Sequence, residues 1–186
     1  GRAAEALVWE QEALLDRVAR QLETSPGEME ARVTSLMQET ARLRREASAQ
    51  ERTASRNQAQ DILDGQGSAK IQEFNGIKVV SGIAQVSSAE GLRDIGDWLR
   101  DKLGSGAVVL GTVVRERPML LVMVTGDPVA RGLHAGNAVK EAATAMGGGG
   151  GGGPEMAQAG GRQADKLEDA VQAAVDVLAQ QAGTKI

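Results

Sequence analysis

The run of seven glycines at residues 147–153 is the stretch of this sequence best suited to hold a ligand through its backbone. Glycine has no Cβ atom, so another molecule can reach the main-chain N–H groups, and several such groups together bind an anion such as a phosphate. The residues that follow, from Pro154 to Gly161, are mostly small or apolar and suited to burial. A flexible linker would continue into serine, glycine or charge, so we interpret the run as a binding loop and keep the linker as its alternative.

Nucleotide and metal chemistry find little support in the sequence. A phosphate loop of the nucleoside-triphosphate kind places Lys and then Ser or Thr after its last glycine, whereas Gly153 is followed by Pro154. His134 is the only histidine and there is no cysteine, so neither a histidine pair nor a thiolate metal site can form. We expect no metal and no cofactor in this chain, and we interpret His134 as a capping or surface residue.

The other candidates for chemistry have simpler interpretations. Four carboxylates share the outer face of one predicted helix, whereas catalytic carboxylates need different environments inside a cleft. These carboxylates, typical of a solvated surface, are Glu90, Asp94, Asp97 and Asp101. Three aromatic residues lie on or beside apolar stripes or at a strand start, and we interpret them as packing residues rather than base-stacking platforms. They are Trp9, Phe74 and Trp98.

Two helices are the first elements that the sequence predicts. Apolar residues recur at three- and four-residue spacing from Leu7 to Leu22 and indicate a first helix. Ser25-Pro26-Gly27-Glu28 supplies an N-cap serine, a proline and a glutamate, so a second helix begins there. Its apolar face includes Leu36 and Leu43 and fades after Ala47, beyond which the helix is expected to be solvated or covered by a partner. The short connection favours an antiparallel hairpin whose stripes meet.

The rest of the chain predicts a globular domain. Strands are indicated from Phe74, and two apolar runs joined by a turn with Arg115 and Arg117 read as a buried hairpin. Helical patterns occur in SAEGLRDIGDWLRDKL, AGNAVKEAATAM and ADKLEDAVQAAVDVLAQQAG, the last two on either side of the glycine run. The prediction is an α+β fold: a coiled-coil-like helical hairpin over residues 1–64, then a mixed β-sheet flanked by helices over residues 68–186.

Length and composition limit the functions available. The 186 residues suffice for one domain and an appendage, and the chain starts without methionine, so we expect a piece of a longer protein. The formal net charge is −4, from 21 Lys and Arg against 25 Asp and Glu, so a nucleic acid would need a local basic patch. No apolar run is long enough to cross a membrane, and we expect a cytoplasmic protein with no membrane partner.

The segment GGGGGGGPEMAQAGG, residues 147–161, resembles a signature near the end of bacterial alanyl-tRNA synthetases. The pattern of that family runs roughly GG-Lys-GGG-Arg-Pro-Asp-Met-Ala-Gln-Ala-Gly-Gly. LETSPGEMEARV is similar to the turn between the family's C-terminal helices, and GLHAGNAVKEAA, residues 132–143, to the helix before its glycine loop. The resemblance extends over essentially the whole chain and implies the C-terminal domain alone, a helical hairpin and a globular unit that also occurs attached to DHH-type phosphoesterases.

The resemblance implies a domain that grips the elbow of alanine tRNA, forms a homodimer through its helices, and assists the catalytic and editing domains of the parent chain. It implies no catalysis here, because the family's aminoacylation motifs and His/Cys zinc editing site are absent. Backbone N–H groups of the glycine run would approach the tRNA. The candidate tRNA-binding residues are Gly147, Gly148, Gly150, Gly151, Gly152, Gln158, Arg162 and Lys140, with Arg115 and Arg117 as further candidates. The candidate dimer contacts are Leu36 and Leu43.

The chain departs from the family pattern at two positions, where Gly149 and Gly153 replace a lysine and an arginine. The loss of two phosphate contacts would weaken a salt-dependent affinity by about tenfold or more. Two other functions therefore stay open: an oligomerisation unit that binds no nucleic acid, its glycine loop packing on its own sheet, and a phosphoesterase fragment. The lack of an Asp/His metal cluster in the sequence makes the phosphoesterase the weakest of these hypotheses.

Overall fold

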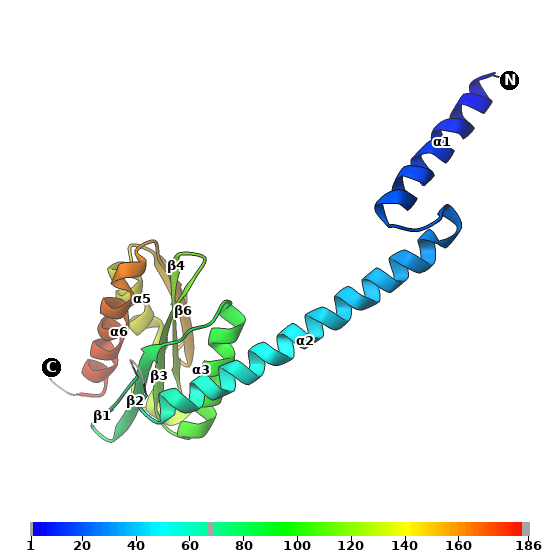
Figure 1. The fold of residues 1–186 in the computed structure, drawn as a ribbon. Coiled ribbons are helices and arrows are strands. Elements are labelled where there is room, and N and C mark those ends of the chain that lie inside the picture. The colour runs from blue at the N-terminus through cyan, green and yellow to red at the C-terminus, as the bar shows by residue number, and fades with distance from the viewer. Residues whose placement is uncertain (1, 67–68, 184–186) are drawn as a thin grey trace. The chain divides into compact units, whose positions relative to one another are not determined.

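The computed structural model describes residues 2–66 and 69–183 (Figure 1). The chain divides into two compact units, residues 1–50 and residues 51–186. The predicted boundary between residues 64 and 68 includes residues 67 and 68, which lie outside the described residues. Among the described helices, none has the length and the apolar composition needed to cross a membrane.

The first unit contains helix α1, Arg2–Gln21, and the start of helix α2, Met29–Leu63. The predicted turn between the two helices is confirmed, with a single 3-10 turn at Pro26–Glu28 before α2. The predicted cap differs in detail, because the Ser25 hydroxyl donates to the Glu28 carboxylate at 2.7 Å and caps no backbone N–H.

The apolar stripes of α1 and α2 are exposed, which differs from the mutual burial expected of a hairpin whose stripes meet. Leu7 is 57% exposed, Leu14 52% and Leu43 51%, whereas Leu36 is half-buried. Most helical stability in proteins comes from the packing of an apolar face, and two isolated helices offer each other little surface. The stripes therefore remain available to a further molecule.

The last turns of α2 belong to the second unit. Ser55, Ala59 and Ile62 are buried, and the latter two join a core cluster with residues of helix α3, Ala89–Leu103. The prediction that this stretch is solvated or covered by a partner is wrong for this face. Serine and alanine give a weak hydrophobic signal in a sequence, yet their small side chains can be fully buried where elements lie close together.

A six-stranded mixed sheet forms the centre of the second unit, in the order β1-β2-β3-β4-β6-β5. The strands are β1 Lys70–Phe74, β2 Ile77–Ile83, β3 Ala107–Val114, β4 Arg117–Val124, β5 Gly149–Gly152 and β6 Met156–Gly160. Strands β2 and β3 pair in parallel because α3 lies between them in the chain, and the other neighbouring strands are antiparallel. The predicted α+β class with a mixed sheet is confirmed.

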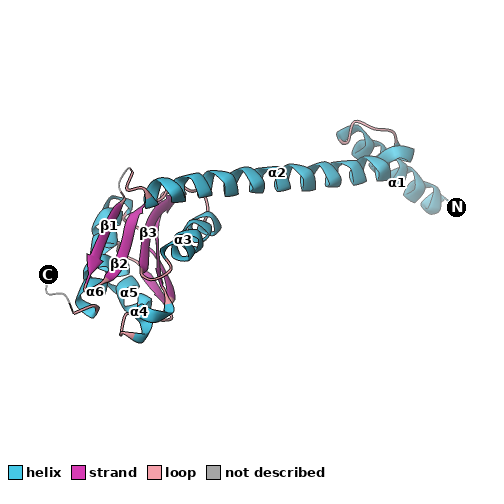
Figure 2. Ribbon diagram, turned by 90° about the horizontal axis from the view of Figure 1, so that it is seen from below, coloured by secondary structure: helices cyan, strands magenta, loops and turns pink. Residues whose placement is uncertain are grey.

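Helices cover both faces of the sheet (Figure 2). The end of α2 and α3 share one core with β3 residues such as Val108. Helices α5, Ala135–Ala145, and α6, Leu167–Gln181, share the other core with residues such as Val109, and the short helix α4, Gly126–Ala130, precedes them. Burial on both faces explains the continuous apolar runs from which the β3–β4 hairpin was predicted.

The middle of the glycine run is a strand rather than a loop or a flexible linker. Gly149–Gly152 form β5, the edge strand, which pairs with β6 in a register from Gly149↔Gly160 to Gly152↔Ala157. Glycine is depleted in strands, so its local preference predicts a loop. Pairing with β6 and contact with α5 override this preference and make the run part of the sheet.

Candidate functional site

A tight turn joins β5 to β6 and is held by helix α5. The Gly153 N–H donates to the Met156 carbonyl at 2.9 Å. The first amides of α5 donate back to this turn, from Ala135 to the Pro154 carbonyl at 2.9 Å and from Gly136 to the Gly153 carbonyl at 3.1 Å. These bonds use N–H groups that would otherwise attract an anion at the start of the helix.

Most amides of the glycine run are also bonded within the protein. The amides of Gly147 and Gly148 donate to carbonyls in the last turns of α5, at 3.1 and 2.9 Å. Along an antiparallel pair, the backbone N–H groups of one strand point alternately toward the partner strand and away from it. Because the Gly153 N–H points to β6, the N–H groups of Gly151 and Gly149 also point to β6. The amides that point away from β6, along the edge, are those of Gly150 and Gly152. The amides of the glycine run that remain free for a ligand are thus those of Gly150 and Gly152.

The glycines at residues 148–153 alternate between positions that require glycine and positions that do not. A Cβ added at Gly150 would lie 2.6 Å from the Ala159 Cβ, and one added at Gly148 would overlap the Gly160 carbonyl oxygen. At three positions no atom lies within 4 Å of an added Cβ, namely Gly149, Gly151 and Gly153. Both positions at which the chain departs from the resembled pattern, Gly149 and Gly153, are therefore open to a side chain.

An open groove of about 900 Å³ lies between the start of the glycine strand and the β3–β4 turn. Three exposed arginines line it, Arg115 and Arg117 at the turn and Arg162 after β6. The glycines that line it are Gly147, Gly148, Gly149, Gly160 and Gly161. None of the three guanidinium groups forms an ion pair with a described residue. The groove is a local basic patch, and a guanidinium group binds phosphate oxygens in pairs.

The β3–β4 turn holds two side chains in an unfavourable backbone conformation. Arg115 has φ 49° and Glu116 φ 64°, both in the left-handed region, inside the two-residue turn closed by the Val114↔Arg117 pair. Turns of this kind favour the pair Asn-Gly. A residue with a larger side chain in the left-handed region lowers the stability of the fold by about 1 kcal/mol or more. Backbone strain is often found at functional sites, and the strained residue Arg115 lines the groove.

A family model described as the DHHA1 domain matches residues 67–180, more than half of the chain. The chain belongs to the DHHA1 domain family. The matched residues of this DHHA1 domain include all six strands and the whole groove.

The DHHA1 domain and its helical extension are similar to curated alanine–tRNA ligases. One from Dehalococcoides mccartyi is 41% identical over 173 residues, which are 93% of this chain and 19% of the relative. One from Chloroflexus aurantiacus is 42% identical over 183 residues, which are 98% of this chain and 20% of the relative. The chain thus spans about a fifth of the length of these relatives.

A solved structure, the C-Ala domain from Aquifex aeolicus alanyl-tRNA synthetase, has a similar fold. The TM-score is 0.53 at 24% sequence identity, over 59% of this chain and 98% of that chain. The resemblance that the glycine signature indicates is confirmed by these comparisons.

The DHHA1 domain brings together part of the predicted tRNA-binding set. Gly147, Gly148 and Arg162 line the groove, together with Arg115 and Arg117. The next predicted residues, Gly150, Gly151 and Gly152, continue from the groove along the edge of the sheet.

Two predicted residues of the DHHA1 domain lie outside the groove. The Gln158 Oε1 accepts a bond of 3.3 Å from Arg93 of α3, and its Nε2 is buried without a partner among the described residues. Lys140 lies in a separate hollow between α5 and α6, with Glu141 and Asp176. Side chains alternate between the faces of a strand, so Gln158 on β6 can point toward α3 although it follows the glycines closely in sequence. Lys140 lies on helix α5, which places it in the hollow beside α6.

The remaining polar candidates of the DHHA1 domain are His134 and the carboxylates of α3. Within residues 2–66 and 69–183, no group of three His, Asp or Glu side chains is placed to hold a metal. His134 is half-buried at the start of α5. Its backbone N–H donates to Gln181 Oε1 at 2.8 Å, and its ring Nδ1 is buried without a partner among described residues. The Asp97 carboxylate pairs with Arg100 at 2.9 Å on the surface of α3.

The aromatic residues divide into two groups. Trp98 is half-buried against the α3 core, with the Lys102 ammonium 5.4 Å from its ring centre, and Phe74 is half-buried against the other core. These two are packing residues, as predicted. Trp9 is 72% exposed on α1, so its predicted packing role is wrong within the described chain. Among the described residues, other apolar side chains of α1, such as Leu7 and Leu14, are exposed as well.

Proposed function

We propose that this chain is a tRNA-binding module of an alanine–tRNA ligase and is not catalytic by itself. The observation that carries the proposal is the groove, in which Arg115, Arg117 and Arg162 form no ion pair with described residues. The similarity to alanine–tRNA ligases over 93% of the chain supports it. The partners of the module are then alanine tRNA and the catalytic and editing domains of the parent chain in the cytoplasm, and no cofactor is needed.

The chemistry of the groove favours the backbone of a folded RNA over its bases. Arginine forms paired hydrogen bonds with phosphate oxygens, and a glycine wall lets a sugar-phosphate chain approach closely. Recognition of unpaired bases relies on stacking against aromatic side chains, and none of the described residues that line the groove is aromatic. Recognition of shape suits a structured feature such as the elbow of tRNA, which is the feature we assign to this groove.

The exposed helical stripes are assigned to a second copy of the chain. Leu7, Leu14 and Leu43 are each more than half exposed, and together with Leu36 they follow helical spacing. Apolar stripes of this kind are buried when helices associate. Dimerisation without RNA binding is the alternative function, and it is favoured by the acidic net charge of −4.

The test places a charge in the groove at Gly149, where an added side chain meets no atom within 4 Å. Gly149→Asp is expected to weaken binding of alanine tRNA about tenfold at about 50 mM salt, because a carboxylate there repels phosphate. Gly149→Asn is the matched control of the same size and is expected to bind within about twofold of the unsubstituted chain. Binding is measured by fluorescence anisotropy of labelled tRNA, and the oligomeric state by sedimentation.

Two results would contradict the proposal. If the folded chain ignores tRNA at low salt and sediments as a dimer, the chain is an oligomerisation unit. If Gly149→Asp binds tRNA as well as Gly149→Asn, tRNA binds at another surface.

Restoring the cations of the resembled pattern is expected to strengthen binding. Gly149→Lys with Gly153→Arg adds two positive charges at positions with open space, and the affinity for tRNA should rise about tenfold at about 150 mM salt. The slope of log affinity against log salt should steepen by about two at the same time. A Gly149→Gln, Gly153→Gln chain controls for side-chain bulk, and an equal gain in that control would refute a role for the charges.

A further inference from the structure

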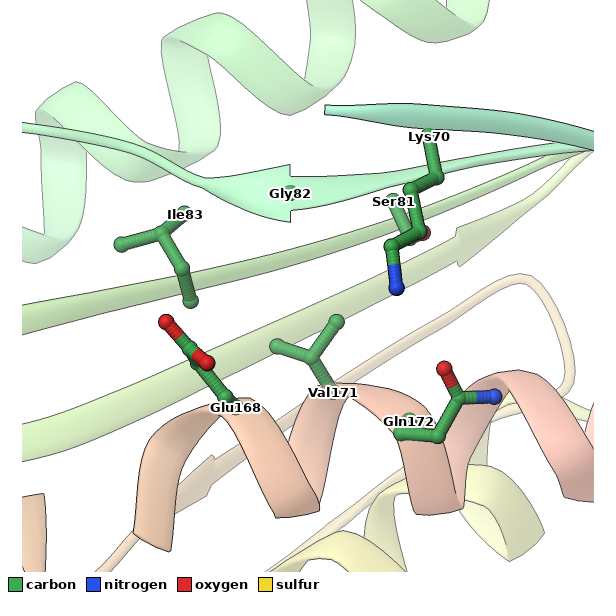
Figure 3. A pocket seen from close by; sticks show the side chains of 7 residues that line it. All are labelled: Lys70, Ser81, Gly82, Ile83, Glu168, Val171 and Gln172. Carbon is green, nitrogen blue, oxygen red and sulfur yellow. The ribbon is translucent and has the colours of Figure 1, made fainter. Parts of the chain in front are cut away.

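A second, smaller pocket lies between the β1–β2 hairpin and helix α6, away from the residues of the groove (Figure 3). Its volume is about 160 Å³. The residues that line it are Lys70, Ser81, Gly82, Ile83, Glu168, Val171 and Gln172. Opposite charges, hydrogen-bonding groups and an apolar wall thus surround one small space.

One side of the pocket offers hydrogen-bond donors. Lys70 of β1 is the register partner of Ser81 of β2, so the two side chains share one face of the sheet. Figure 3 shows the Lys70 chain extended toward α6 with the Ser81 oxygen beside it. Ser81 is only 4% exposed, and it lines the pocket beside Lys70. An ammonium group and a hydroxyl group placed together suit a carboxylate.

The helix side of the pocket offers acceptors. Glu168 and Gln172 are one turn apart on α6, and Figure 3 shows the Glu168 carboxylate pointing up toward the strand near Ile83. Gln172 donates its amide N–H to Asp176 at 2.7 Å, which leaves its carbonyl oxygen to accept. The nearby Lys166 pairs with Asp169 at 3.0 Å rather than with Glu168. A carboxylate with a neighbouring amide oxygen suits an ammonium group.

The two charges of the pocket do not neutralise each other. Neither the Lys70 ammonium nor the Glu168 carboxylate forms an ion pair within the described parts of the chain. Both line the same space, with Val171 lying between them on the α6 side (Figure 3). A ligand that carries both charges a few atoms apart would complete both contacts at once.

We propose that this pocket binds a small zwitterion, an α-amino acid with a short aliphatic side chain. Its carboxylate lies against the Lys70 ammonium and the Ser81 hydroxyl, and its ammonium group lies against Glu168. The side chain contacts Val171 and Ile83, whose apolar atoms line the pocket. The volume of about 160 Å³ has room for a small free amino acid. The proposal does not depend on tRNA binding, because it uses none of the residues of the groove.

The test compares three ligands that differ only in charge. L-Alanine carries both charges, propionate lacks the ammonium group and L-alaninamide lacks the carboxylate. Titration of each into the whole chain is followed by NMR chemical shifts of the backbone amides of residues 70, 81 and 168. L-Alanine is expected to bind with a Kd below about 10 mM and at least about tenfold more tightly than either analogue.

Two variants assign the contacts. Lys70→Gln and Glu168→Gln are each expected to weaken L-alanine binding at least about tenfold. Lys78→Gln is the control, since Lys78 lies three residues from Ser81 on β2 and its side chain leaves the opposite face of the sheet. It should bind as the unsubstituted chain does, and circular dichroism reports whether each variant is folded.

Three outcomes would overturn the proposal. They are no saturable shift with L-alanine up to about 10 mM, equal binding of L-alanine and propionate, and unchanged binding by folded Lys70→Gln and Glu168→Gln chains. Loss of tRNA binding leaves this result untouched, and loss of L-alanine binding leaves the tRNA result untouched, so the two proposals fail separately.

Discussion

Replacing Gly148 by alanine is expected to lower the free energy of unfolding of the globular unit by about 2–3 kcal/mol. A Cβ at this position would overlap the carbonyl oxygen of Gly160, which is backbone and cannot turn aside as a flexible side chain can. The β5–β6 pair would have to separate at its base. The loss is measured by urea denaturation followed by circular dichroism, and the melting temperature should fall by about 5–10 °C.

The neighbouring residue supplies the control for this prediction. Gly149→Ala places its Cβ in open space, with no atom within 4 Å. Its stability should stay within about 0.5 kcal/mol of the unsubstituted chain. Equal losses for Gly148→Ala and Gly149→Ala would show that glycine is needed for backbone freedom along the whole run, and that the close approach to β6 is not the reason.

Removing the three charges of the groove is expected to give the largest change in tRNA affinity. A chain with Arg115→Gln, Arg117→Gln and Arg162→Gln should bind alanine tRNA about 100- to 1,000-fold more weakly at about 50 mM salt. The slope of log affinity against log salt should fall by about two to three, since each arginine that meets a phosphate contributes about one to it. Anisotropy titrations at several salt concentrations give both quantities.

A basic residue outside the groove separates a local effect from one of net charge. Lys140→Gln removes one positive charge from the hollow between α5 and α6, where Glu141 and Asp176 lie nearby. Its affinity should change by less than about twofold. If Lys140→Gln weakens binding as much as a single arginine replacement does, the RNA lies over α5 and α6 or responds only to overall charge.

The helices and the central hairpin could be predicted from sequence because their signals are local. Leu92, Ile95 and Leu99 recur at helical spacing on α3 and are buried, as the pattern predicts. Strands β3 and β4 form a continuous apolar run on each side of a two-residue turn. In these elements, local preference and tertiary packing favour the same structure.

The two edge strands were harder to predict because long-range pairing decides them. β5 consists of four glycines, whose local preference is for turns, and it becomes a strand through its register with β6. β1 begins at Lys70, and its alternating side chains KIQEF gave too weak a signal, so the predicted strand region begins only at Phe74. Both strands depend on a partner that a local pattern does not reveal.

The candidate site was predicted in part for the same reason. The glycine signature correctly pointed to the segment that contains β5. The predicted anion binding, however, required free backbone amides, and the amides of Gly147 and Gly148 are bonded to carbonyls of α5. Gln158 lies within the signature and still meets Arg93 on the α3 side of the sheet. The groove itself joins residues more than 40 positions apart, and only folding brings the turn arginines to the glycines.

The left-handed turn at Arg115 and Glu116 bears on how this protein would respond to laboratory evolution. A library selected only for survival of heating would enrich Asn-Gly at these two positions, because that pair fits the turn without strain. Each variant selected in this way would lack the guanidinium group of Arg115 that lines the groove. Heat resistance and retention of RNA are thus opposing selection pressures at this one turn, and a screen for stabilised variants has to score both traits.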